Sequence, residues 1–568
     1  MAKLISADLT NNKLCILEYT TTDGKMLSFG DEAFDAKIVS HTYTDRGKII
    51  FDKPITKLGN KAFCKCNNLK GITIPDCVTT IGELAFYDCS SLTNITIPNS
   101  VTAIEWYTFS GCSNLTSVTI GVSVTTIGEY AFYRCPSLSK FSGKFAENSG
   151  RILVADGMLV AFAQAELTEY SIPNSVTIIR GDAFCDCKNL TSVTIPNSVT
   201  SIGHSVFSGC SSLTSVTIPN SVTSIGHSVF SGCSSLSSVT IPNGVTIIGN
   251  FTFENCSSLI GVTIPNSVTT IGGYAFRDCK NLRSITVPDS VTSIGYEAFK
   301  GCSSLISLTI PNRVTTIEDG AFEDCTKLTS VTIGNSVTSI GKRAFRFCSS
   351  IISVTIPDSV KIIGDAAFNS CSSLTSVTIP NSVMTVGKGT FNGCNSIREF
   401  NGKFAEDNGR ILVINNTLVT IAKAKLTEYS IPDNITSIGN FAFSGCQNLI
   451  SVTIPNSVTT IGEYAFCDCK NLTSVTIPDS VITIKNSTFS NCKSLSHLTI
   501  GKNVTIIGHN AFKGCSNINI IICRATTPPE LTSNSWDITP SCIEKFETLV
   551  VPTGCEEAYA NSDWGKYL

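Results

Sequence analysis

The chain has 568 residues, 26 cysteines and a formal net charge of −3. Only 15% of the residues are charged, well below the usual quarter, so we expect no broad attraction to nucleic acid or anionic lipid. No stretch approaches 18 uninterrupted apolar residues, and no membrane span is expected.

The first residues read MAKLISADLTNNKLCILEYTTTDGK and contain neither an apolar h-region nor a cleavage site. The sequence therefore predicts no signal peptide within this chain. Two alternatives stay open: a cytoplasmic protein, or a leader that lies outside this sequence.

Residues 1–51 differ from everything that follows and are predicted to form an N-terminal β cap. Leu14 to Tyr19 and Met26 to Phe29 flank the sequence TTTDGK, which predicts a strand, a turn and a second strand. A cap of this kind covers the open first turn of a stacked array.

From residue 52 a cysteine returns every 23 residues, and a phenylalanine always stands three places before it. These cysteines are Cys66, Cys89, Cys112 and Cys135, then nine equal steps from Cys187 to Cys394, then Cys446, Cys469, Cys492 and Cys515. A fixed period of this length predicts a solenoid in which each turn contacts only its neighbours. We assign repeats to residues 52–140, 173–399 and 432–523.

The turn from Cys210 to Cys233 shows the local pattern. Val216 and Ile218 alternate with polar residues, as in a strand with one buried face. Gly226 is expected to form a tight corner in which a positive φ is allowed. Residues 226–233 predict one helical or 3₁₀ turn that directs Phe230 inward. The predicted fold is a leucine-rich repeat solenoid with a parallel β-sheet on one face and short helical or 3₁₀ turns on the other.

The consensus L-x-x-V-T-I-P-x-S-V-T-x-I-G-x-x-A-F-x-x-C, which covers about residues 52–523, resembles the BspA-type leucine-rich repeat of bacterial surface proteins. The resemblance implies a secreted or outer-surface protein that adheres to host proteins or to other cells. The absence of a leader in this sequence is a departure from that pattern.

Two gaps of 52 residues break the register, from Cys135 to Cys187 and from Cys394 to Cys446. Residues 141–172 and 400–431 are predicted to form irregular repeats, each with a β-hairpin that turns at 155–157 or 415–416. The two segments resemble each other and lie 259 residues apart, which indicates a block duplication. An alternative is that the hairpins form a binding lip.

Residues 524–568 are predicted to form a C-terminal cap with a last strand at 548–551 and a short helix near the end. Trp536 and Trp564 are expected to cover the ring of Phe512; ligand stacking is the alternative. The repeat cysteines are predicted to be buried free thiols, with disulfides along the stack as the alternative.

No catalytic motif is present, and we expect neither an enzyme nor a cofactor or metal site. His204 and His227 share a register position on adjacent turns, which indicates a solvated ladder or, alternatively, an incomplete metal pair. Threonine stands seven places after the repeat cysteine in fifteen turns. This ladder suits a solvated strand, and its alternatives are binding of glycan or of ice.

The residues that flank Ala-Phe vary most between turns, and exposed aromatic and arginine side chains are favoured at protein interfaces. We therefore predict a partner-binding edge made of Trp106, Tyr107, Tyr130, Tyr133, Arg134, Phe251, Tyr296, Arg343, Arg346 and Phe347. Neutral drift on a solvated edge is the alternative. The sequence thus favours a protein-binding or adhesion solenoid at the cell surface, with a structural spacer or a glycan-binding module as the other possibilities.

Overall fold

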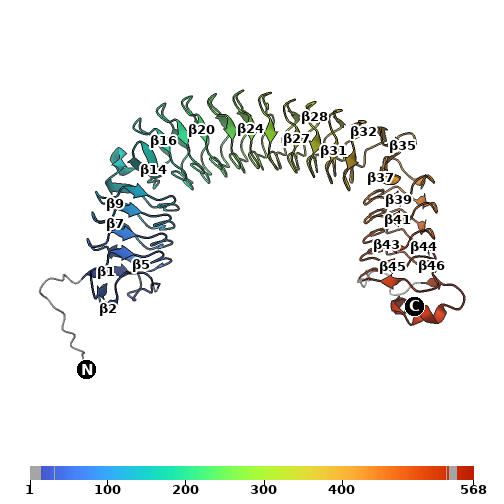
Figure 1. Cartoon of the computed structure of the whole chain (residues 1–568), viewed down its shortest axis with the longest axis horizontal. Coiled ribbons are helices and arrows are strands. Elements are labelled where there is room, and N and C mark those ends of the chain that lie inside the picture. Colours follow the sequence, from blue (N-terminus) through green and yellow to red (C-terminus); the bar gives the residue numbers. More distant parts are fainter. Residues whose placement is uncertain (1–14, 31, 533, 537–546, 568) are drawn as a thin grey trace. The chain divides into compact units, whose positions relative to one another are not determined.

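The computed structural model describes residues 15–30, 32–532, 534–536 and 547–567. Leu14 and Cys542 lie outside the described residues. The chain divides into two compact units, Met1–Lys280 and Asn281–Leu568, and each is a stack of turns of about 23 residues (Figure 1). The predicted solenoid is confirmed.

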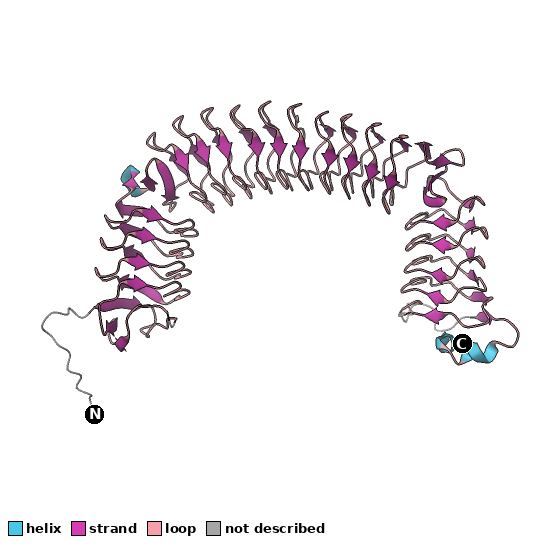
Figure 2. Ribbon diagram, in the orientation of Figure 1, coloured by secondary structure: helices cyan, strands magenta, loops and turns pink. Residues whose placement is uncertain are grey.

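Regular turns contain two short strands and a corner, except that the turn with Ile285 has only its second strand, and the described residues contain very little helix (Figure 2). In the turn from Cys210 to Cys233 the strands are β19 (Ser215–Thr217) and β20 (Ser224–Ile225). β19 pairs in parallel and in register with the first strands of both neighbouring turns, and β20 pairs in the same way with the second strand of the preceding turn. The predicted parallel sheet is therefore joined by a second one, built from the second strand of each turn.

In the first unit, the first strands of the turns are β5 (Leu69–Thr73), β7 (Asn94–Thr96), β9 (Ser117–Ile120), β11 (Lys140–Gly143), β15 (Glu169–Ser171), β17 (Ser192–Thr194), β19, β21 (Ser238–Thr240) and β23 (Gly261–Thr263). The second strands are β4 (Lys57–Leu58), β6 (Thr80–Ile81), β8 (Ala103–Ile104), β10 (Thr126–Ile127), β16 (Ile178–Ile179), β18 (Ser201–Ile202), β20, β22 (Ile247–Ile248) and β24 (Thr270–Ile271).

In the second unit, the first strands are β26 (Ser307–Thr309), β28 (Ser330–Thr332), β30 (Ser353–Thr355), β32 (Ser376–Ile379), β34 (Glu399–Gly402), β38 (Glu428–Ser430), β40 (Ser451–Thr453), β42 (Ser474–Thr476), β44 (His497–Ile500) and β46 (Ile520–Cys523). The second strands are β25 (Ser293–Ile294), β27 (Thr316–Ile317), β29 (Ser339–Ile340), β31 (Ile362–Ile363), β33 (Thr385–Val386), β39 (Ser437–Ile438), β41 (Thr460–Ile461), β43 (Thr483–Ile484), β45 (Ile506–Ile507) and β47 (Glu530–Leu531).

The corner differs in detail from the predicted helical turn. Residues 226–233 form hydrogen-bonded turns, because Ser228 and Gly232 have φ values of 58° and 75°, which a right-handed helix does not allow. Gly226 itself lies outside the positive-φ region. A Cβ at this position would lie 2.5 Å from the backbone nitrogen of His204 in the preceding turn, so close approach of the turns requires the glycine.

The corners hold the turns together through a regular set of backbone hydrogen bonds. Ser228, Phe230 and Gly232 donate their N–H groups to carbonyls of the next corner over distances of 2.7–2.9 Å. These donors stand five, three and one places before the repeat cysteine. The same three positions donate in the same way in regular corners of both units.

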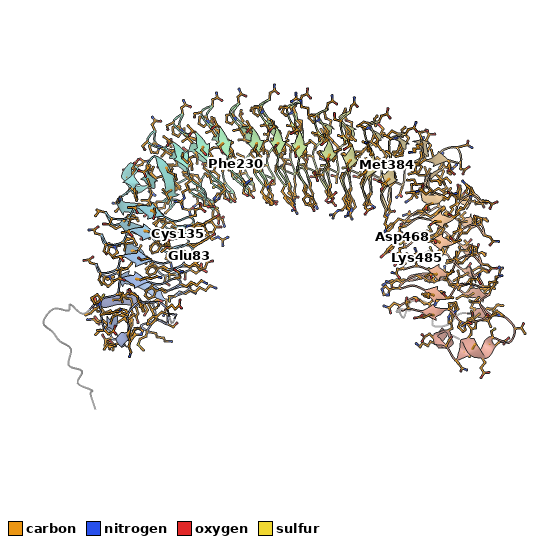
Figure 3. All side chains as sticks on the ribbon, in the orientation of Figure 1. Glu83, Cys135, Phe230, Met384, Asp468 and Lys485 are labelled. Atoms are coloured by element: carbon orange, nitrogen blue, oxygen red, sulfur yellow. The ribbon has the colours of Figure 1, made fainter. Side chains whose placement is uncertain are left out.

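In the regular turns of each unit the core is a column of stacked rings and thiols; Figure 3 labels Phe230 and Cys135. Phe230 is fully buried, and its ring lies 5.6 Å from that of Phe207 and 5.5 Å from that of Phe253, nearly parallel to both. The thiol of Cys233 donates to the carbonyl of Phe207 at 3.1 Å. The cysteines of regular turns thus fill a small apolar space and, as at Cys233, add a weak hydrogen bond between turns.

The N-terminal cap differs from its prediction. β1 (Ile16–Thr21) pairs antiparallel with β3 (Gly47–Phe51) and with β5, and β3 also pairs with β2 (Ile38–Tyr43). Residues 26–29 form no strand, so the predicted hairpin with them is wrong. The hydroxyl of Tyr19 accepts the N–H of Leu27, and this segment turns inward instead of pairing with β1.

The two predicted hairpins are confirmed. The hairpin of the first unit is formed by β13 (Ile152–Ala155) and β14 (Met158–Phe162), which pair antiparallel. It is preceded by β12 (Ala146–Glu147) and the 3₁₀ turn η1 (Asn148–Gly150). In the second unit, β35 (Ala405–Glu406), β36 (Ile411–Ile414) and β37 (Thr417–Ile421) repeat this arrangement. β14 and β37 then pair in parallel with β16 and β39, so each hairpin is part of a sheet.

The C-terminal cap contains β48 (Thr548–Val550), α1 (Glu556–Ala560) and the 3₁₀ helix η2 (Asp563–Tyr567). Trp536 stacks on Phe512 with ring centroids 4.5 Å apart, and Trp564 packs edge-on against Trp536 at 5.9 Å. Both tryptophans are buried; Trp536 covers Phe512 as predicted, whereas Trp564 packs on Trp536.

Candidate functional site

In each unit the regular ladder of corners stops at the hairpin, and we name these two places the first and the second break. At the first break the corner of residues 128–135 is followed by the corner of residues 180–187, with the hairpin β13–β14 between them. The N–H groups of Tyr130, Phe132 and Arg134 occupy the three donating positions of their corner. Within the described part of the chain, none of the three makes a hydrogen bond to a following corner.

Four of the predicted site residues meet at the first break. The rings of Tyr107 and Tyr130 stack with centroids 4.6 Å apart and planes 2° apart, and Tyr133 packs edge-on against Tyr130 at 5.8 Å. The guanidinium of Arg134 lies 5.1 Å from the centre of the Tyr133 ring. Trp106 precedes Tyr107 in the chain and is 54% exposed. We name these five residues the aromatic patch.

The backbone at Arg134 is unusual for its side chain. The residue before every repeat cysteine has a positive φ, and most of these residues are Gly, Asp, Asn or Ser, which tolerate that conformation. This explains the recurring acidic residue there, for example Asp186, without any calcium site. Bulky residues stand at this position only three times: Lys65, Arg134 and Phe347. A bulky residue held in this region marks a candidate functional position.

A group of charged residues beneath the aromatic patch was not predicted from the sequence. The carboxylate of Asp182 is buried, and its Oδ2 lies 3.6 Å from Nδ1 of His204. Nε2 of His204 lies 3.9 Å from Oε2 of Glu129 on the other side of the break. Burial raises the pKa of Asp182 to about 6, against the opposing effect of the His204 charge and of the Tyr130 hydroxyl. Burial and the Asp182 charge in turn raise the pKa of Tyr130.

Arg180 closes the first break from the opposite side. It replaces the usual corner glycine, and its Nη1 donates to the carbonyl of Ile127, 53 residues earlier. In a regular turn this carbonyl would accept the N–H of the next corner glycine, as Ile179 accepts that of Gly203. The departure from glycine at Arg180 was the available sequence signal for this contact, but its partner depends on the fold of the hairpin.

The other predicted residues do not join the aromatic patch. Phe251 stacks on Tyr274 at 4.7 Å elsewhere in the first unit. In the second unit Tyr296 is 36% exposed and Arg343 is half-buried. Arg346 lies 4.5 Å above the ring of Phe347 and 3.3 Å from the carboxylate of Glu323. The predicted edge is therefore a series of separate clusters.

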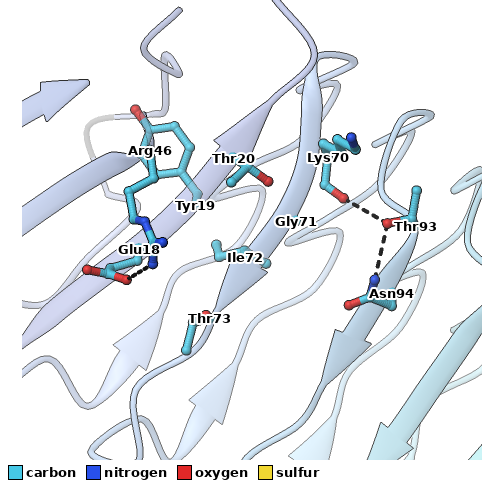
Figure 4. A pocket seen from close by; sticks show the side chains of 10 residues that line it. All are labelled: Glu18, Tyr19, Thr20, Arg46, Lys70, Gly71, Ile72, Thr73, Thr93 and Asn94. Carbon is cyan, nitrogen blue, oxygen red and sulfur yellow. Dashed lines mark hydrogen bonds and ion pairs between the residues drawn. The ribbon is translucent and has the colours of Figure 1, made fainter. Parts of the chain in front are cut away.

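A further hollow of about 330 Å³ lies where the N-terminal cap meets the first turns (Figure 4). Two of its charged residues, Glu18 and Arg46, form an ion pair at 3.0 Å, and Lys48 also lies 3.2 Å from the Glu18 carboxylate. Hydrogen bonds from Arg46 and then Lys48 lower the pKa of Glu18. None of the predicted site residues lines this hollow.

The predicted threonine ladder is present. Thr194, Thr217 and Thr240 lie directly opposite one another in β17, β19 and β21, and all three are exposed. The hydroxyls three places earlier serve the stack itself, since Thr214 donates to the carbonyl of Thr191 at 3.1 Å. Among the described residues there is no group of three His, Cys, Asp or Glu side chains placed to hold a metal ion. None of the described helices is long and apolar enough to cross a membrane.

Parallel strands in register, a buried Leu-Val-Ile-Phe-Cys column and a 23-residue period define a leucine-rich repeat solenoid. The sequence profile described as "BspA type Leucine rich repeat region (6 copies)" matches residues 36–149, 159–283, 271–398 and 420–533. The chain belongs to the BspA-type leucine-rich repeat family.

Similar solved structures include a leucine-rich repeat protein from Bacteroides ovatus ATCC 8483, with 26% identity, coverage of 70% of this chain and 94% of that chain, and a TM-score of 0.47. A leucine rich cell surface protein from Faecalibacterium prausnitzii A2-165 has 26% identity, coverage of 73% and 96%, and a TM-score of 0.41. A leucine-rich repeat protein from Eubacterium ventriosum ATCC 27560 has 24% identity, coverage of 64% and 91%, and a TM-score of 0.32. The comparison with curated protein sequences gives no match.

Proposed function

We propose that this protein is a non-enzymatic protein-binding solenoid that acts in adhesion at the cell surface or after secretion, and that the aromatic patch contacts the partner. The single observation that carries the proposal is the concentration of Trp106, Tyr107, Tyr130, Tyr133 and Arg134 at the point where the corner ladder stops.

The chemistry of the patch supports this role. Tyrosine, tryptophan and arginine are the residue types most often responsible for binding energy at protein interfaces. The Tyr107–Tyr130 stack and the contact between Arg134 and Tyr133 hold four of these side chains in place before binding, which lowers the entropy lost on association. The unused N–H groups of Tyr130, Phe132 and Arg134 add donors for backbone recognition.

The proposed location rests on the family. Membership of the BspA-type leucine-rich repeat family is shown, and the family resemblance implies secreted or outer-surface proteins. Surface display would also give the patch access to proteins of a host or of other cells.

The test measures binding of the purified chain to a panel of extracellular-matrix and plasma proteins by surface plasmon resonance. The variant Trp106→Ala/Arg134→Ala is expected to weaken any specific complex by tenfold or more, as the loss of one or two interface anchors does. Tyr464→Ala is the matched control, because Tyr464 is an exposed aromatic of the second unit in an equivalent corner stack with Phe441. Equal binding by both variants and the unmodified chain would contradict the proposal.

A glycan-binding function is the second candidate, and the threonine ladder favours it. The aligned hydroxyls of Thr194, Thr217 and Thr240 are exposed and repeat at the spacing of the strands, about 4.8 Å. Binding on a glycan array that is lost in Thr217→Val, with protein binding absent, would favour this candidate. Absence of binding in both the protein-binding assay and the glycan array would favour a structural spacer.

A further inference from the structure

The second break contains a hollow with a volume of about 260 Å³. Residues from both sides line it: Val386, Gly387, Lys388 and Gly389 precede the break, and Gly439 and Lys485 follow it. The strands β37, β39 and β41 contribute Thr417, Ser437 and Thr460.

The hollow is open because the residue that fills the first break is missing from the second. The two breaks lie 259 residues apart, so Arg180 corresponds to Gly439 and Ile127 corresponds to Val386. At the first break the guanidinium of Arg180 donates to the carbonyl of Ile127. Gly439 has no side chain, and no described residue donates a hydrogen bond to the carbonyl of Val386.

The charge at the second break is also reversed. Glu129 at the first break corresponds to Lys388 at the second. Lys388 and Lys485 both line the hollow, and neither ammonium group forms an ion pair with a described carboxylate. Glu463, which follows the lining residue Gly462, accepts a hydrogen bond from the side-chain amide of Asn486 at 3.3 Å.

The backbone adds one more donor. Gly389 occupies the first donating position of its corner, and no described acceptor receives its N–H. The hollow therefore presents two cations and one N–H group, together with one unused carbonyl acceptor, that of Val386. A peptide that carries an acidic side chain has the complementary set: a carboxylate for the donors and a backbone N–H for the carbonyl.

We propose that the second break binds an acidic side chain, with its adjoining backbone, from a protein partner. Lys388, Lys485 and the N–H of Gly389 receive the carboxylate, and the carbonyl of Val386 accepts a peptide N–H. The volume of about 260 Å³ suits one side chain and its backbone, since it is smaller than typical pockets for drug-sized ligands. This inference rests on the proposed protein-binding function but concerns a different part of the chain from the aromatic patch.

The test uses the full chain and two blocked tripeptides, acetyl-Ala-Glu-Ala-amide and acetyl-Ala-Gln-Ala-amide, in calorimetric or NMR titrations. The Glu peptide is expected to bind about tenfold more tightly than the Gln peptide, and added salt is expected to weaken it. Gly439→Arg copies the residue of the first break into the hollow and is expected to abolish binding. Lys388→Gln/Lys485→Gln is expected to do the same without filling the space, and Lys361→Gln, outside the hollow, is the matched control.

Equal binding of the two peptides, or undiminished binding by Lys388→Gln/Lys485→Gln, would overturn the proposal. Glucuronic acid bound as tightly as the Glu peptide would overturn the assignment to a peptide. The aromatic patch is unchanged in these variants, so loss of peptide binding and loss of binding through Trp106 and Arg134 are measured separately.

A second inference comes from an independent observation in the N-terminal cap. Cys15 precedes β1 and Cys77 follows β5, and the antiparallel register that places Glu18 opposite Thr73 brings the two cysteines together. Their sulfur atoms lie 2.7 Å apart. In contrast, the cysteines of regular turns donate to phenylalanine carbonyls, as Cys89 does to that of Phe63 at 3.0 Å.

The geometry points to Cys15 and Cys77 as a disulfide pair that ties the cap to the second turn. With a small-molecule disulfide as oxidant, a thiolate of the pair attacks the oxidant, releases one thiol and forms a mixed disulfide. The partner cysteine then displaces the second thiol, so two protons and two electrons leave the protein as one S–S bond forms. Burial, followed by the contact with Cys15, raises the pKa of Cys77 to about 12, so we expect the reaction to be slow at neutral pH.

Oxidised glutathione at mildly alkaline pH, followed by non-reducing proteolysis and mass spectrometry, tests this pair. The expected product is a single crosslinked peptide that joins Cys15 to Cys77, with a raised thermal midpoint that returns to its initial value on reduction. Cys77→Ser is expected to show neither change, and Cys185→Ser, which removes another half-buried cysteine, is the control. A glutathione adduct that never converts to the crosslink, or a crosslink between other cysteines, would overturn the inference.

Discussion

The two breaks share one backbone arrangement but differ in what fills it. At the first, Arg180 spans the gap and donates to the carbonyl of Ile127, and acidic and aromatic side chains surround it. At the second, Gly439 leaves a hollow lined by lysines. The comparison teaches that the hairpin determines where the ladder stops, whereas a few side chains decide whether that place is closed or open.

The largest expected effect is the stability lost when a phenylalanine ring is removed, and this loss is expected to be larger in the regular stack than at a break. Phe230→Ala removes a fully buried ring from between two others and is expected to cost about 3–5 kcal/mol of stability. Phe132→Ala at the first break is expected to cost less, because the Phe132 ring is half-buried. Urea denaturation monitored by circular dichroism measures both, and equal costs would contradict the distinction.

Removal of the side chain that closes the first break is expected to have the next largest effect. Arg180→Gly leaves the carbonyl of Ile127 without its donor. It also leaves the carboxylates of Asp182 and Glu129 without a nearby guanidinium. We therefore expect a loss of about 2–3 kcal/mol of stability. Amide hydrogen exchange of residues 127–135 localises the loss. The reciprocal Gly439→Arg change is expected to leave the second unit equally or more stable, and marked destabilisation would show that the two breaks are not equivalent.

The first break is also expected to depend on pH. The pKa of Asp182 is raised to about 6 in the folded chain, above its usual value, so the native state holds a proton that the unfolded chain has lost. The contribution of this carboxyl group to stability is therefore fully present below about pH 4, and it is lost as the pH rises through about 6. After allowance for solvent screening, we expect this loss to lower the free energy of unfolding by about 2 kcal/mol.

Asp182→Asn is expected to remove this fall in denaturation measurements from pH 4 to 7. His204, Glu129, Arg180 and Tyr130 also face this carboxylate. His204→Gln is therefore measured in parallel to separate the imidazole from the carboxylate. Phe441 takes the place of Asp182 at the second break, so no such dependence is expected there. An unchanged pH profile in Asp182→Asn would refute the assignment.

The smallest expected effect concerns the stacked rings of the aromatic patch. Tyr107→Ala removes the stack with Tyr130 and is expected to cost about 1 kcal/mol. The equivalent corner position before the second break holds Ala366, so Ala366→Ser is a matched control with little expected change. A thermal shift assay resolves the two, and equal shifts would show that the stack adds no stability.

The repeated positions made most of the fold predictable. Phe230 and Cys233 recur in every regular turn, and the positions of Val216 and Ile218 hold Val, Ile or Leu, so one turn's pattern predicts the others. The cap was less predictable because Tyr19 and its neighbours occur once, and nothing in the local sequence shows that β1 pairs with residues 47–51 and 69–73.

The candidate site was predictable only in part. Aromatic departures from the repeat marked Tyr107 and Tyr130, but their stack was not predicted. His204 was singled out from the sequence, but its contacts with Asp182 and Glu129 were not, because the contact with Glu129 crosses a break whose shape depends on the hairpin. The hollow at the second break was not predictable, because a glycine such as Gly439 indicates no open space by itself. The space becomes apparent only when the structure shows that the equivalent residue, Arg180, fills it at the first break.

Amide hydrogen exchange, resolved to single residues, tests most directly whether the ladder of corners stops at the two breaks. The N–H groups of Phe207 and Phe230 are bonded to the next corner and are expected to exchange slowly. Those of Tyr130, Phe132 and Arg134, and of Gly389, Phe391 and Gly393, are expected to exchange orders of magnitude faster. Uniform protection across both sets would contradict the account.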